Sequence, residues 1–292
     1  MNIGIDVGGT FIRAGRIEKN KVLARVKVRT EPEKGRDAVI SRILSAASEV
    51  FTKACGSAGI GIAGPVDFRK GIVARTPNLP LDDTDISRIL RKELGIPVYA
   101  DNDANCCVLA EAIYGAGKGH DKVAGLTLGT GIGGGLVAGK RIYHGRMNAC
   151  EFGHMSINLD GRACGCGNTG CLEAYVGKKG LMTMAGSAAK EPLGVYKAAA
   201  KGDRKALKAF SRYGRYLGTG IDSIIKCFDP DIFVLQGGIS GAYRFFSSSM
   251  RKEIRRRELF RSCPVVKGKL GGDAGIIGAA GLPLQCSDIR KI

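Results

Sequence analysis

A strand–glycine turn–strand unit occurs twice in this chain, about 120 residues apart, and constrains the fold more than any other feature. In the first unit, an apolar strand at residues 2–7 ends on Gly8-Gly9-Thr10 and returns through residues 11–17. The second unit runs from Val123 to Ala138, and we expect its turn to cover the glycine-rich residues 129–135. Glycines at such turns expose backbone N–H groups to an anion without a Cβ in the way. The repeat therefore predicts two related halves, each with an anion-binding loop.

Neither glycine turn matches a common nucleotide-binding motif. The Walker A pattern, a glycine-rich loop that ends in Gly-Lys-Ser/Thr, does not occur in the sequence. Gly129, Gly131 and Gly134 fit G-x-G-x-x-G, and Glu151 follows about 20 residues later. The dinucleotide fingerprint also needs a helix directly after its glycines, and the apolar run that follows here is too short for one. We therefore expect phosphate loops outside the Rossmann class.

The stretch from residue 151 to 173 has the composition of a metal site. One histidine and three cysteines fall within eighteen residues, which is typical of a tetrahedral zinc site with no open position. The candidate ligands are His154, Cys164, Cys166 and Cys171. Glu151 and Glu173 flank them, and a rigid zinc loop would hold both carboxylates in place. The alternative is a chance grouping in a chain with ten cysteines, although the chain has only three histidines.

Cysteine content and hydropathy indicate the compartment and exclude a membrane segment. Ten cysteines without secretory features predict reduced thiols in the cytoplasm. The first strand begins at once, which leaves no room for a signal peptide. No apolar run approaches the roughly 18 residues that a membrane helix requires. We therefore expect a cytoplasmic protein with no membrane partner.

The net charge of +18 permits two interpretations. Such a field could attract nucleic acid or an anionic substrate such as ATP, or it could be a property of the whole proteome of the organism. The basic residues are scattered, apart from the run Arg251 to Arg257. We expect that run to be the solvated face of a helix with Ile254 pointing inward, and we expect no nucleic-acid partner.

Polar residues follow two apolar strands between the glycine turns. Residues 59–63 form one expected strand and lead into Gly64, while residues 97–100 form another and lead into Asp101-Asn102-Asp103-Ala104-Asn105. A helix is expected at 104–114. Binding and catalytic groups concentrate at such strand ends. Asp and Asn also commonly cap helices, and this alternative applies to Asp101, Asp103 and Asn105.

Further elements follow from apolar spacing. Residues 37–53 predict an amphipathic helix, 82–92 a polar helix, and 204–227 a long amphipathic helix that carries three glycines. Shorter helices are expected at 181–189 and 196–201, a buried strand at 232–235, and a final helix at 273–280.

Together these residues resemble the ROK family of repressors, open reading frames and sugar kinases, within the actin–hexokinase superfamily. Asp6-Val7-Gly8-Gly9-Thr10 is similar to its first phosphate loop, Leu128 to Gly135 is similar to its second, and residues 151–173 resemble its signature. The resemblance covers residues 6 to about 280. It implies a two-domain α/β fold of the actin/hexokinase-like (ribonuclease H-like) class with a central cleft. The expected domains are 1–115 plus 275–292, onto which the final helix packs back, and 116–274.

The resemblance also implies an ATP-dependent sugar kinase. Asp103 matches the catalytic base, and phosphoryl transfer needs a carboxylate to accept the hydroxyl proton. The implied sugar-binding residues are Gly64, Asn78, Asn102, Asp103, Glu151, His154 and Glu173. His154 would serve twice, with one ring nitrogen on the structural Zn²⁺ and the other offered to the sugar.

The implied nucleotide site combines both glycine turns with a third loop. Its residues are Asp6, Gly8, Gly9, Thr10, Gly129, Thr130, Gly131, Gly133, Gly237 and Gly238. Asp6 would hold Mg²⁺, directly or through water, because a carboxylate at a phosphate loop suits a hard cation. Residues 236–241 resemble the adenosine loop of the family, and the alternative is a plain strand-to-helix turn.

The expected reaction transfers the γ-phosphate of ATP to the 6-hydroxyl of a hexose or N-acylhexosamine. Glucose, N-acetylmannosamine and N-acetylglucosamine lead, and fructose is an alternative. Pro77-Asn78-Leu79 is similar to the glucokinase-like members, whereas the chain length is also seen among N-acetylmannosamine kinases and fructokinases. A sugar-responsive transcriptional regulator would carry a helix-turn-helix before the first loop, and here that loop begins at Asp6. A non-catalytic sugar sensor is a third possibility, and a homodimer is usual in the family.

Overall fold

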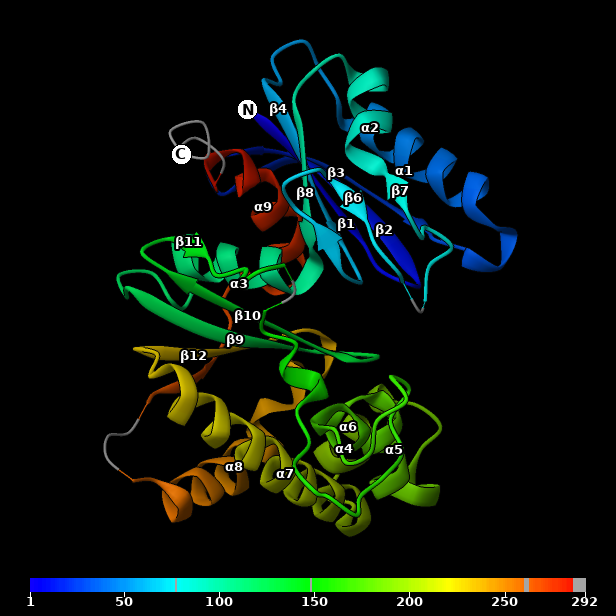
Figure 1. The fold of residues 1–292 in the computed structure, drawn as a ribbon. Coiled ribbons are helices and arrows are strands. Elements are labelled where there is room, and N and C mark those ends of the chain that lie inside the picture. The colour runs from blue at the N-terminus through cyan, green and yellow to red at the C-terminus, as the bar shows by residue number, and fades with distance from the viewer. Residues whose placement is uncertain (77, 148, 260–262, 286–292) are drawn as a thin grey trace. The chain divides into compact units, whose positions relative to one another are not determined.

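The computed structural model describes residues 1–76, 78–147, 149–259 and 263–285 and is of the α/β class, as expected (Figure 1). It divides into two compact units. Unit 1 comprises Met1–Gly119, Gly135–Ala149 and Lys269–Ile292, and unit 2 comprises His120–Gly134 and Cys150–Gly268. The segment 135–149, which the sequence places in the second domain, belongs to unit 1. A Cβ on Gly135 would lie 3.1 Å from the Cβ of Val108, so this segment packs on unit 1.

The main sheet of unit 1 has the strand order β3-β2-β1-β4-β8. Its strands are β1 (Asn2–Val7), β2 (Phe11–Glu18), β3 (Lys21–Arg29), β4 (Ser57–Ile62) and β8 (Val98–Asn102). β1, β2 and β3 pair antiparallel in sequence, whereas β4 runs parallel to both β1 and β8. The carboxyl ends of β1, β4 and β8 therefore meet at one edge of the sheet, where ligands bind in α/β folds.

Helices cover both faces of this sheet. The helices are α1 (Arg36–Val50), α2 (Ile86–Leu94), α3 (Asp103–Tyr114) and α9 (Ala274–Gly281), and short 3₁₀ turns lie at Pro32–Lys34, Gly271–Asp273 and Leu282–Gln285. Ile3, Ile5 and Val7 share one core with α1 and α2. Gly4 points to the opposite face, where its Cβ would lie 1.8 Å from the carbonyl oxygen of Ile276 in α9. The final helix thus packs on the first domain, as expected.

A small antiparallel sheet lies between β4 and α2 in the sequence. Its strands are β5 (Val66–Asp67), β6 (Ile72–Val73) and β7 (Thr84–Asp85), in the order β5-β6-β7. The expected helix at 82–92 is shorter at its start, because residues 84 and 85 pair with β6 and Asp85 then caps α2 by accepting a hydrogen bond from the Arg88 amide.

The second main sheet has the order β11-β10-β9-β12-β13, with β12 parallel to β9 and to β13. Its strands are β9 (Lys122–Leu128), β10 (Ile132–Ala138), β11 (Arg141–Ile142), β12 (Ile232–Gln236) and β13 (Val265–Lys267). Each sheet thus places a parallel strand after a hairpin, and this supports the prediction of two related halves. The expected turn at 129–135 was too long, because β10 already begins at Ile132.

The helical part of unit 2 is built around α7. Its helices are α4 (Leu172–Val176), α5 (Lys178–Ala185), α6 (Pro192–Ala200), α7 (Arg204–Phe228) and α8 (Tyr243–Arg257), with 3₁₀ turns at Phe152–His154, Gly186–Ala188 and Gly238–Ala242. Two glycines let α7 and α8 approach closely. A Cβ on Gly214 would lie 2.4 Å from the Phe246 carbonyl oxygen, and one on Gly218 would lie 2.6 Å from that of Met250.

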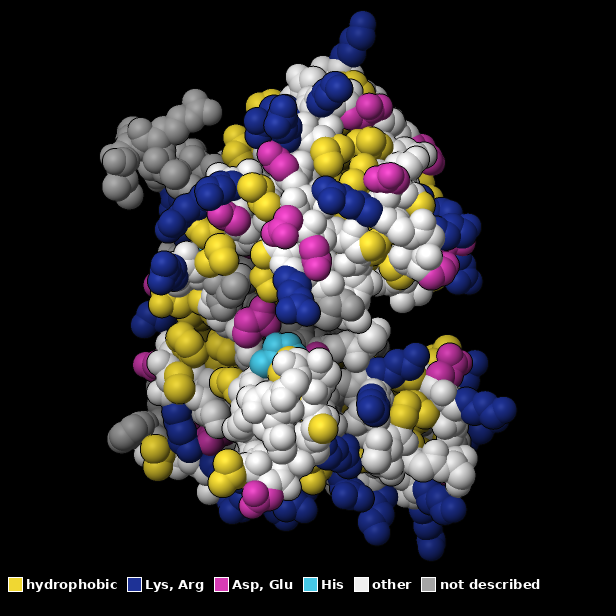
Figure 2. All heavy atoms as spheres, turned by 45° about the vertical axis from the view of Figure 1, so that its right-hand side comes forward, with side chains coloured by type: hydrophobic (Ala, Val, Ile, Leu, Met, Phe, Trp, Pro, Cys, Tyr) yellow, Lys and Arg dark blue, Asp and Glu magenta, His cyan; other side chains and the backbone are white. Residues whose placement is uncertain are grey.

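Basic side chains spread over the surface shown in Figure 2, with acidic ones between them. The run at 251–257 lies on α8, and Ile254 is buried there as predicted. Glu253 is buried beside it and accepts hydrogen bonds from Arg256 and Arg257. Within the described residues, none of the helices combines the length and the apolar character that a membrane span requires.

Candidate active site

The carboxyl edge of the first sheet gathers residues that lie far apart in the sequence. Asp6 on β1 aligns with Gly61 on β4, which in turn aligns with Asp101 on β8. Strands lie about 4.8 Å apart, so the Cα atoms of Asp6 and Asp101 are about 10 Å apart. Asp103 comes two residues after Asp101 at the same edge. This edge therefore carries both the first glycine loop and the expected base, with the end of β4 between them.

Asn102 caps the helix that Asp103 begins. Its Oδ1 accepts hydrogen bonds from the amides of Ala104 (2.9 Å) and Asn105 (3.2 Å), and its Nδ2 donates to the Gly64 carbonyl (3.2 Å). The capping alternative thus applies to Asn102 and not to Asp101 or Asn105, which bond to each other. The structure brings Gly64, Asn102 and Asp103 together, with Asn102 engaged at both ends of its amide.

Asp103 is the first residue of α3 and is half-buried. Its Oδ1 accepts a hydrogen bond of 2.9 Å from the Ala104 amide. Desolvation first, and then the negative charges of Asp6 and Asp103, raise the pKa of the Cys107 thiol. Both carboxylates therefore act on the same side chain of α3, which is consistent with their place at one sheet edge.

The first glycine loop is a tight hairpin turn. The Gly8 amide donates to the Phe11 carbonyl (3.1 Å), and the Gly8 carbonyl accepts from the Thr30 hydroxyl (2.6 Å). Because this bond uses the Gly8 amide, the amides of Gly9 and Thr10 remain as the candidates for binding phosphate. A Cβ on Gly9 would lie 3.7 Å from the Cβ of Asn78, so Asn78 is next to this loop.

Asp6 at the base of the loop is paired with Arg13, a residue that sequence reasoning missed. The Arg13 guanidinium lies 3.0 Å from Asp6 Oδ2. Burial raises the pKa of Asp6, and the charge and hydrogen bond of Arg13 lower it in part. The two residues are directly opposite each other in the β1–β2 register, so a hairpin that closes on residues 8–11 already implies the pair.

The second glycine loop, in unit 2, is also a tight turn between two strands, closed by a bond across two residues instead of three. The Gly129 amide donates to the Gly131 carbonyl (3.0 Å), and the Lys178 amide donates to the carbonyls of Gly129 and Thr130. The amide of Gly133 donates to Thr127 Oγ1 (3.2 Å) from within β10. The Gly133 amide thus already has a partner in the structure, and the role that the sequence predicts for it stays a prediction, as do those of Thr130 and Gly131.

Glu173 lies against this second loop. One carboxylate oxygen accepts a hydrogen bond of 2.8 Å from the Ile132 amide, and a Cβ on Gly131 would lie 2.4 Å from the same oxygen. Only glycine leaves room for the carboxylate at that position. The cysteine-rich stretch and the second glycine loop are thus joined by one charge-assisted hydrogen bond.

Gly237 and Gly238 follow β12 at the same edge as the second loop. Gly237 has a φ of +86°, and a Cβ there would lie 2.5 Å from the Leu128 carbonyl oxygen. Two groups of Ser240, its amide and its hydroxyl, donate to the Gly237 carbonyl. A Cβ on Gly238 would have no neighbour within 4 Å among the described residues, so this backbone can accept a flat group against it.

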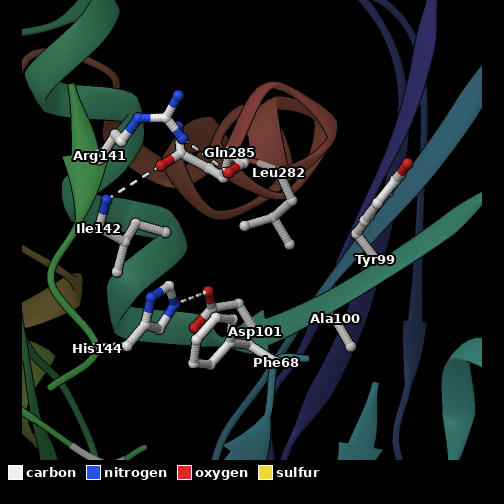
Figure 3. Close-up of a pocket in the computed structure, with 9 residues that line it drawn as sticks. All are labelled: Phe68, Tyr99, Ala100, Asp101, Arg141, Ile142, His144, Leu282 and Gln285. Atoms are coloured by element: carbon white, nitrogen blue, oxygen red, sulfur yellow. Dashed lines mark hydrogen bonds and ion pairs between the residues drawn. The ribbon is translucent and has the colours of Figure 1, made fainter. Parts of the chain in front are cut away.

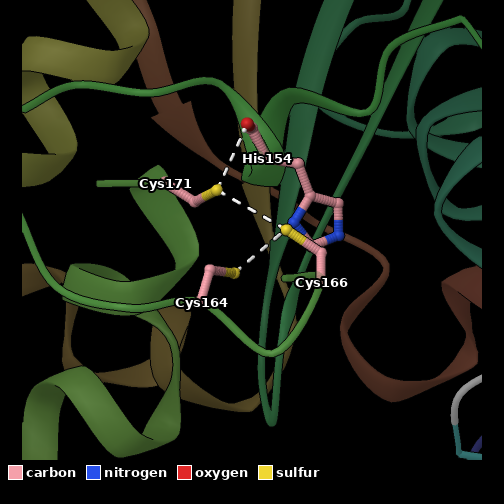
Figure 4. A group of neighbouring side chains, drawn as sticks. All are labelled: His154, Cys164, Cys166 and Cys171. Atoms are coloured by element: carbon pink, nitrogen blue, oxygen red, sulfur yellow. Dashed lines mark hydrogen bonds between the residues drawn. The ribbon is translucent and has the colours of Figure 1, made fainter. Parts of the chain in front are cut away.

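The predicted metal ligands form one cluster (Figure 4). The ligand atoms of His154, Cys164, Cys166 and Cys171 all lie within 4.8 Å of one another. The sulfurs of Cys166 and Cys171 are 3.7 Å apart, and Cys164 Sγ is 3.7 Å from His154 Nδ1. A tetrahedral zinc ion at about 2.3 Å from each sulfur would separate two sulfurs by about 3.8 Å. The donor set and its spacing therefore fit zinc, with Nδ1 as the ligand nitrogen.

Glu151 lies close to this cluster at the surface. Although the residue is exposed, desolvation by the surrounding protein raises the pKa of its carboxyl, His154 lowers it, and the negative charge of Glu173 raises it further. Glu151, His154 and Glu173 are therefore close enough to interact electrostatically. They form a group of acceptors and a donor that suits a polyhydroxylated ligand.

Known proteins similar to this chain are found by sequence and by structure. The family model described as "ROK family" matches residues 2–285. A glucokinase from Thermotoga maritima is 35% identical, over 96% of this chain and 96% of that protein. A xylose repressor from Bacillus subtilis is 29% identical, over 97% of this chain and 77% of that protein. The fold matches the crystal structure of a ROK family glucokinase from Streptomyces griseus in complex with glucose and AMPPNP, with a TM-score of 0.87. The two sequences are 34% identical, and the match covers 96% of this chain and 98% of that one.

Proposed function

Because the chain belongs to the ROK family, we propose that it is an ATP-dependent kinase that phosphorylates the 6-hydroxyl of a hexose or N-acylhexosamine, with glucose as the leading substrate. A glucokinase relative that aligns over nearly the whole chain supports this, as does a similar structure that holds glucose and an ATP analogue. The observation that carries the proposal is the place of Asp103, at the strand edge that also holds the first glycine loop.

Asp103 is the general base of the proposed reaction. Its carboxylate accepts the proton of the 6-hydroxyl while that oxygen attacks the γ-phosphorus in line, and ADP leaves. A positioned base of this kind contributes about 10²–10⁴-fold to the rate. The hydrogen bond from the Ala104 amide and the capped start of α3 orient the carboxylate before the sugar binds.

The nucleotide is held mainly by backbone groups. The amides of Gly9, Thr10, Thr130 and Gly131 bind phosphate oxygens, and the backbone at 237–238 lies against the adenosine. Mg²⁺, when bound, neutralises the developing charge on the phosphates. Asp6 is the acidic side chain at the first loop and would hold Mg²⁺, directly or through water, while its Oδ2 is paired with Arg13.

The sugar is bound by residues from both glycine-loop regions. Glu151 and Glu173 accept hydrogen bonds from sugar hydroxyls, and His154 offers Nε2 because Nδ1 is directed at the cysteine cluster. Asn102, bonded to the Gly64 carbonyl, and Asn78, beside Gly9, contribute the remaining polar contacts. A structural Zn²⁺ on the cysteine cluster would fix the ring orientation of His154 and the start of α4, which carries Glu173.

A hexose panel tests this function directly. Purified protein is incubated with Mg²⁺-ATP and, separately, with glucose, N-acetylglucosamine, N-acetylmannosamine or fructose, and ADP release is followed by a coupled assay. We expect ADP release that depends on the sugar, with the phosphate on the 6-oxygen of the product by ³¹P and ¹³C NMR. ADP formation that is equal with and without every sugar would refute the proposal.

A regulatory function is the second candidate because the xylose repressor aligns with 97% of this chain. A salt-dependent gel shift on a specific operator, without sugar-dependent ADP release, would favour it. Tight sugar binding without either activity would favour a sensor. We further propose a cytoplasmic homodimer, which sedimentation of the purified protein would test.

A further inference from the structure

A small cavity of about 130 Å³ lies in unit 1, beside the strand that leads to Asp103 (Figure 3). Its walls come from β8, from the segment that contains β11, from the small sheet region and from the chain after α9. Asp101 and His144 form its most buried polar contact, with 5% and 13% of their side chains exposed. No role in substrate binding has been given to either residue, although Asp101 is only two positions from the proposed base.

His144 is held in one orientation from two sides. Its Nε2 lies 2.6 Å from Asp101 Oδ2, and its ring is stacked on Phe68 with 3.6 Å between ring centroids and 8° between ring planes. In Figure 3 the imidazole and the carboxylate point toward each other from separate segments of the chain. The stack sets the plane of the imidazole, and the hydrogen bond then sets the direction of the Asp101 carboxylate.

Asp101 transmits this orientation to the start of α3. Its other oxygen accepts hydrogen bonds from the Asn102 amide (2.7 Å) and from Asn105 Nδ2 (2.9 Å). Asn102 in turn caps α3 through its side chain, and Asp103 lies between Asn102 and the capped amides. A continuous set of hydrogen bonds therefore runs from His144 to the residues on both sides of the proposed base.

The chain around His144 is tied to its neighbours in unit 1, since the Ile142 amide donates a hydrogen bond of 3.1 Å to Gln285 Oε1. A Cβ on Gly135 would lie 3.1 Å from Val108 and 3.2 Å from Asn105 Oδ1. That buried Oδ1 has no hydrogen-bond partner among the residues that the structure describes. Asn105 is therefore held through its Nδ2, which donates to Asp101. If the hydrogen bond from His144 were lost, Asp101 would keep the bonds from Asn105 Nδ2 and the Asn102 amide, both of which reach its other oxygen.

We propose that His144 is a positioning residue for phosphoryl transfer: through Asp101 it fixes the β8–α3 junction and thereby the direction of the Asp103 carboxylate. The inference rests on the proposed function of Asp103. Displacement of a catalytic group by about 1 Å costs about 10²-fold in rate, so a small rotation of this junction is sufficient to impair turnover. Binding of ATP, and the sugar contacts proposed for Glu151, His154 and Glu173, depend on other atoms, so both affinities are expected to change little.

Replacement of His144 by three residues tests the hydrogen bond separately from the stack. His144→Phe keeps a flat ring on Phe68 but removes the donor, His144→Gln supplies an amide donor near the position of Nε2, and His144→Asn supplies one that is too short to reach Asp101. We expect kcat to fall about 10- to 100-fold in the Phe and Asn variants, with both KM values within about twofold, and to recover in the Gln variant to within about threefold of wild type. His120→Phe, at an exposed histidine, is the matched control and should have no effect.

The outcomes separate this inference from the proposed function. Asp103→Asn is measured in the same assay, and circular dichroism and thermal melting confirm that each variant is folded. If Asp103→Asn loses turnover while His144→Phe and His144→Asn keep it, the positioning role is overturned alone. If kcat falls as much in His144→Gln as in His144→Asn, the positioning role is also overturned. If His144→Phe does not fold, the comparison of Gln with Asn decides. A wild-type protein without sugar-dependent turnover would overturn both proposals.

Discussion

Loss of one zinc ligand should weaken sugar binding by an amount that follows from a single hydrogen bond. We consider Cys166→Ser, because Cys166 is exposed and its replacement leaves the packed interior intact. Cys171 precedes Glu173 by two residues, so the proposed Zn²⁺ is the fixed point from which Glu173 reaches the Ile132 amide at 2.8 Å. Without the metal, α4 loses this fixed start and the carboxylate loses its defined position.

The magnitude depends on the proposed hydrogen bond that the Glu173 carboxylate accepts from a sugar hydroxyl, which is lost when the carboxylate is no longer held in place. A hydrogen bond to a charged group contributes about 1.5–3 kcal/mol, and about 1.4 kcal/mol corresponds to a tenfold change in an equilibrium constant. Release of Glu173 should therefore raise the KM for sugar about 10- to 150-fold. The KM for ATP should rise as well, because the hydrogen bond from the Ile132 amide to Glu173 holds the second glycine loop at Gly131–Ile132.

Two measurements on matched variants check this. Metal analysis of the purified protein should give about one Zn²⁺ per chain in wild type and little in Cys166→Ser, and initial rates give both KM values. Cys227→Ser, at another exposed cysteine, should retain the metal and normal kinetics. A Cys166→Ser protein that loses zinc and keeps its KM for sugar would refute the scaffold role of the metal. One that retains zinc would refute the ligand assignment.

Two further predictions concern stability. Hydrogen bonding by Arg256, aided by Arg257, lowers the pKa of Glu253 to about 2, so its stabilising charge is complete above about pH 4.5 and is lost as the pH falls toward 2. Glu253→Gln should therefore lower the free energy of unfolding at pH 6, as measured by urea titration, and the difference from wild type should shrink below pH 4.5. A difference that does not depend on pH would contradict the assignment. Gly59→Ala should destabilise the protein by about 3 kcal/mol or more, because its Cβ would lie 1.8 Å from the Ala279 carbonyl oxygen. The control Gly56→Ala has open space around its Cβ and should melt like wild type. Equal melting temperatures for the two variants would contradict the close approach of α9 to β4.

The sequence was most informative where pattern and chemistry agree locally. The hairpin around Gly8 and Gly9, the strand before Asp101 and the helix after it were all confirmed, because apolar period and strand-end polar residues point to the same structure. The spacing of the cysteines with His154 also predicted a compact cluster correctly. The edge strand β3 went unpredicted, although the alternation of Val22, Ala24, Val26 and Val28 with polar residues was a usable signal.

The errors arose where tertiary contacts override local preference. Gly133, Gly134 and Gly135 resemble a loop by composition, yet they lie in β10, and close approach of neighbouring chain requires a residue without a side chain at Gly134. A Cβ on Gly134 would be 2.3 Å from the Cys150 carbonyl oxygen. The contact of His144 with Asp101 joins residues 43 apart in the sequence, and no local pattern encodes it. Such pairs are defined only once the chain has folded.

The turnover of Asp103→Asn is the most direct test of the central claim. Asparagine keeps the size of the side chain and an oxygen for the Ala104 amide, but it cannot accept the hydroxyl proton. We expect a folded protein that binds the sugar with normal affinity by calorimetry and whose kcat falls at least about 10²-fold, while Asp37→Asn, at an exposed aspartate, turns over normally. Near-normal kcat in Asp103→Asn would contradict the account, because the reaction would then proceed without the carboxylate on which it depends.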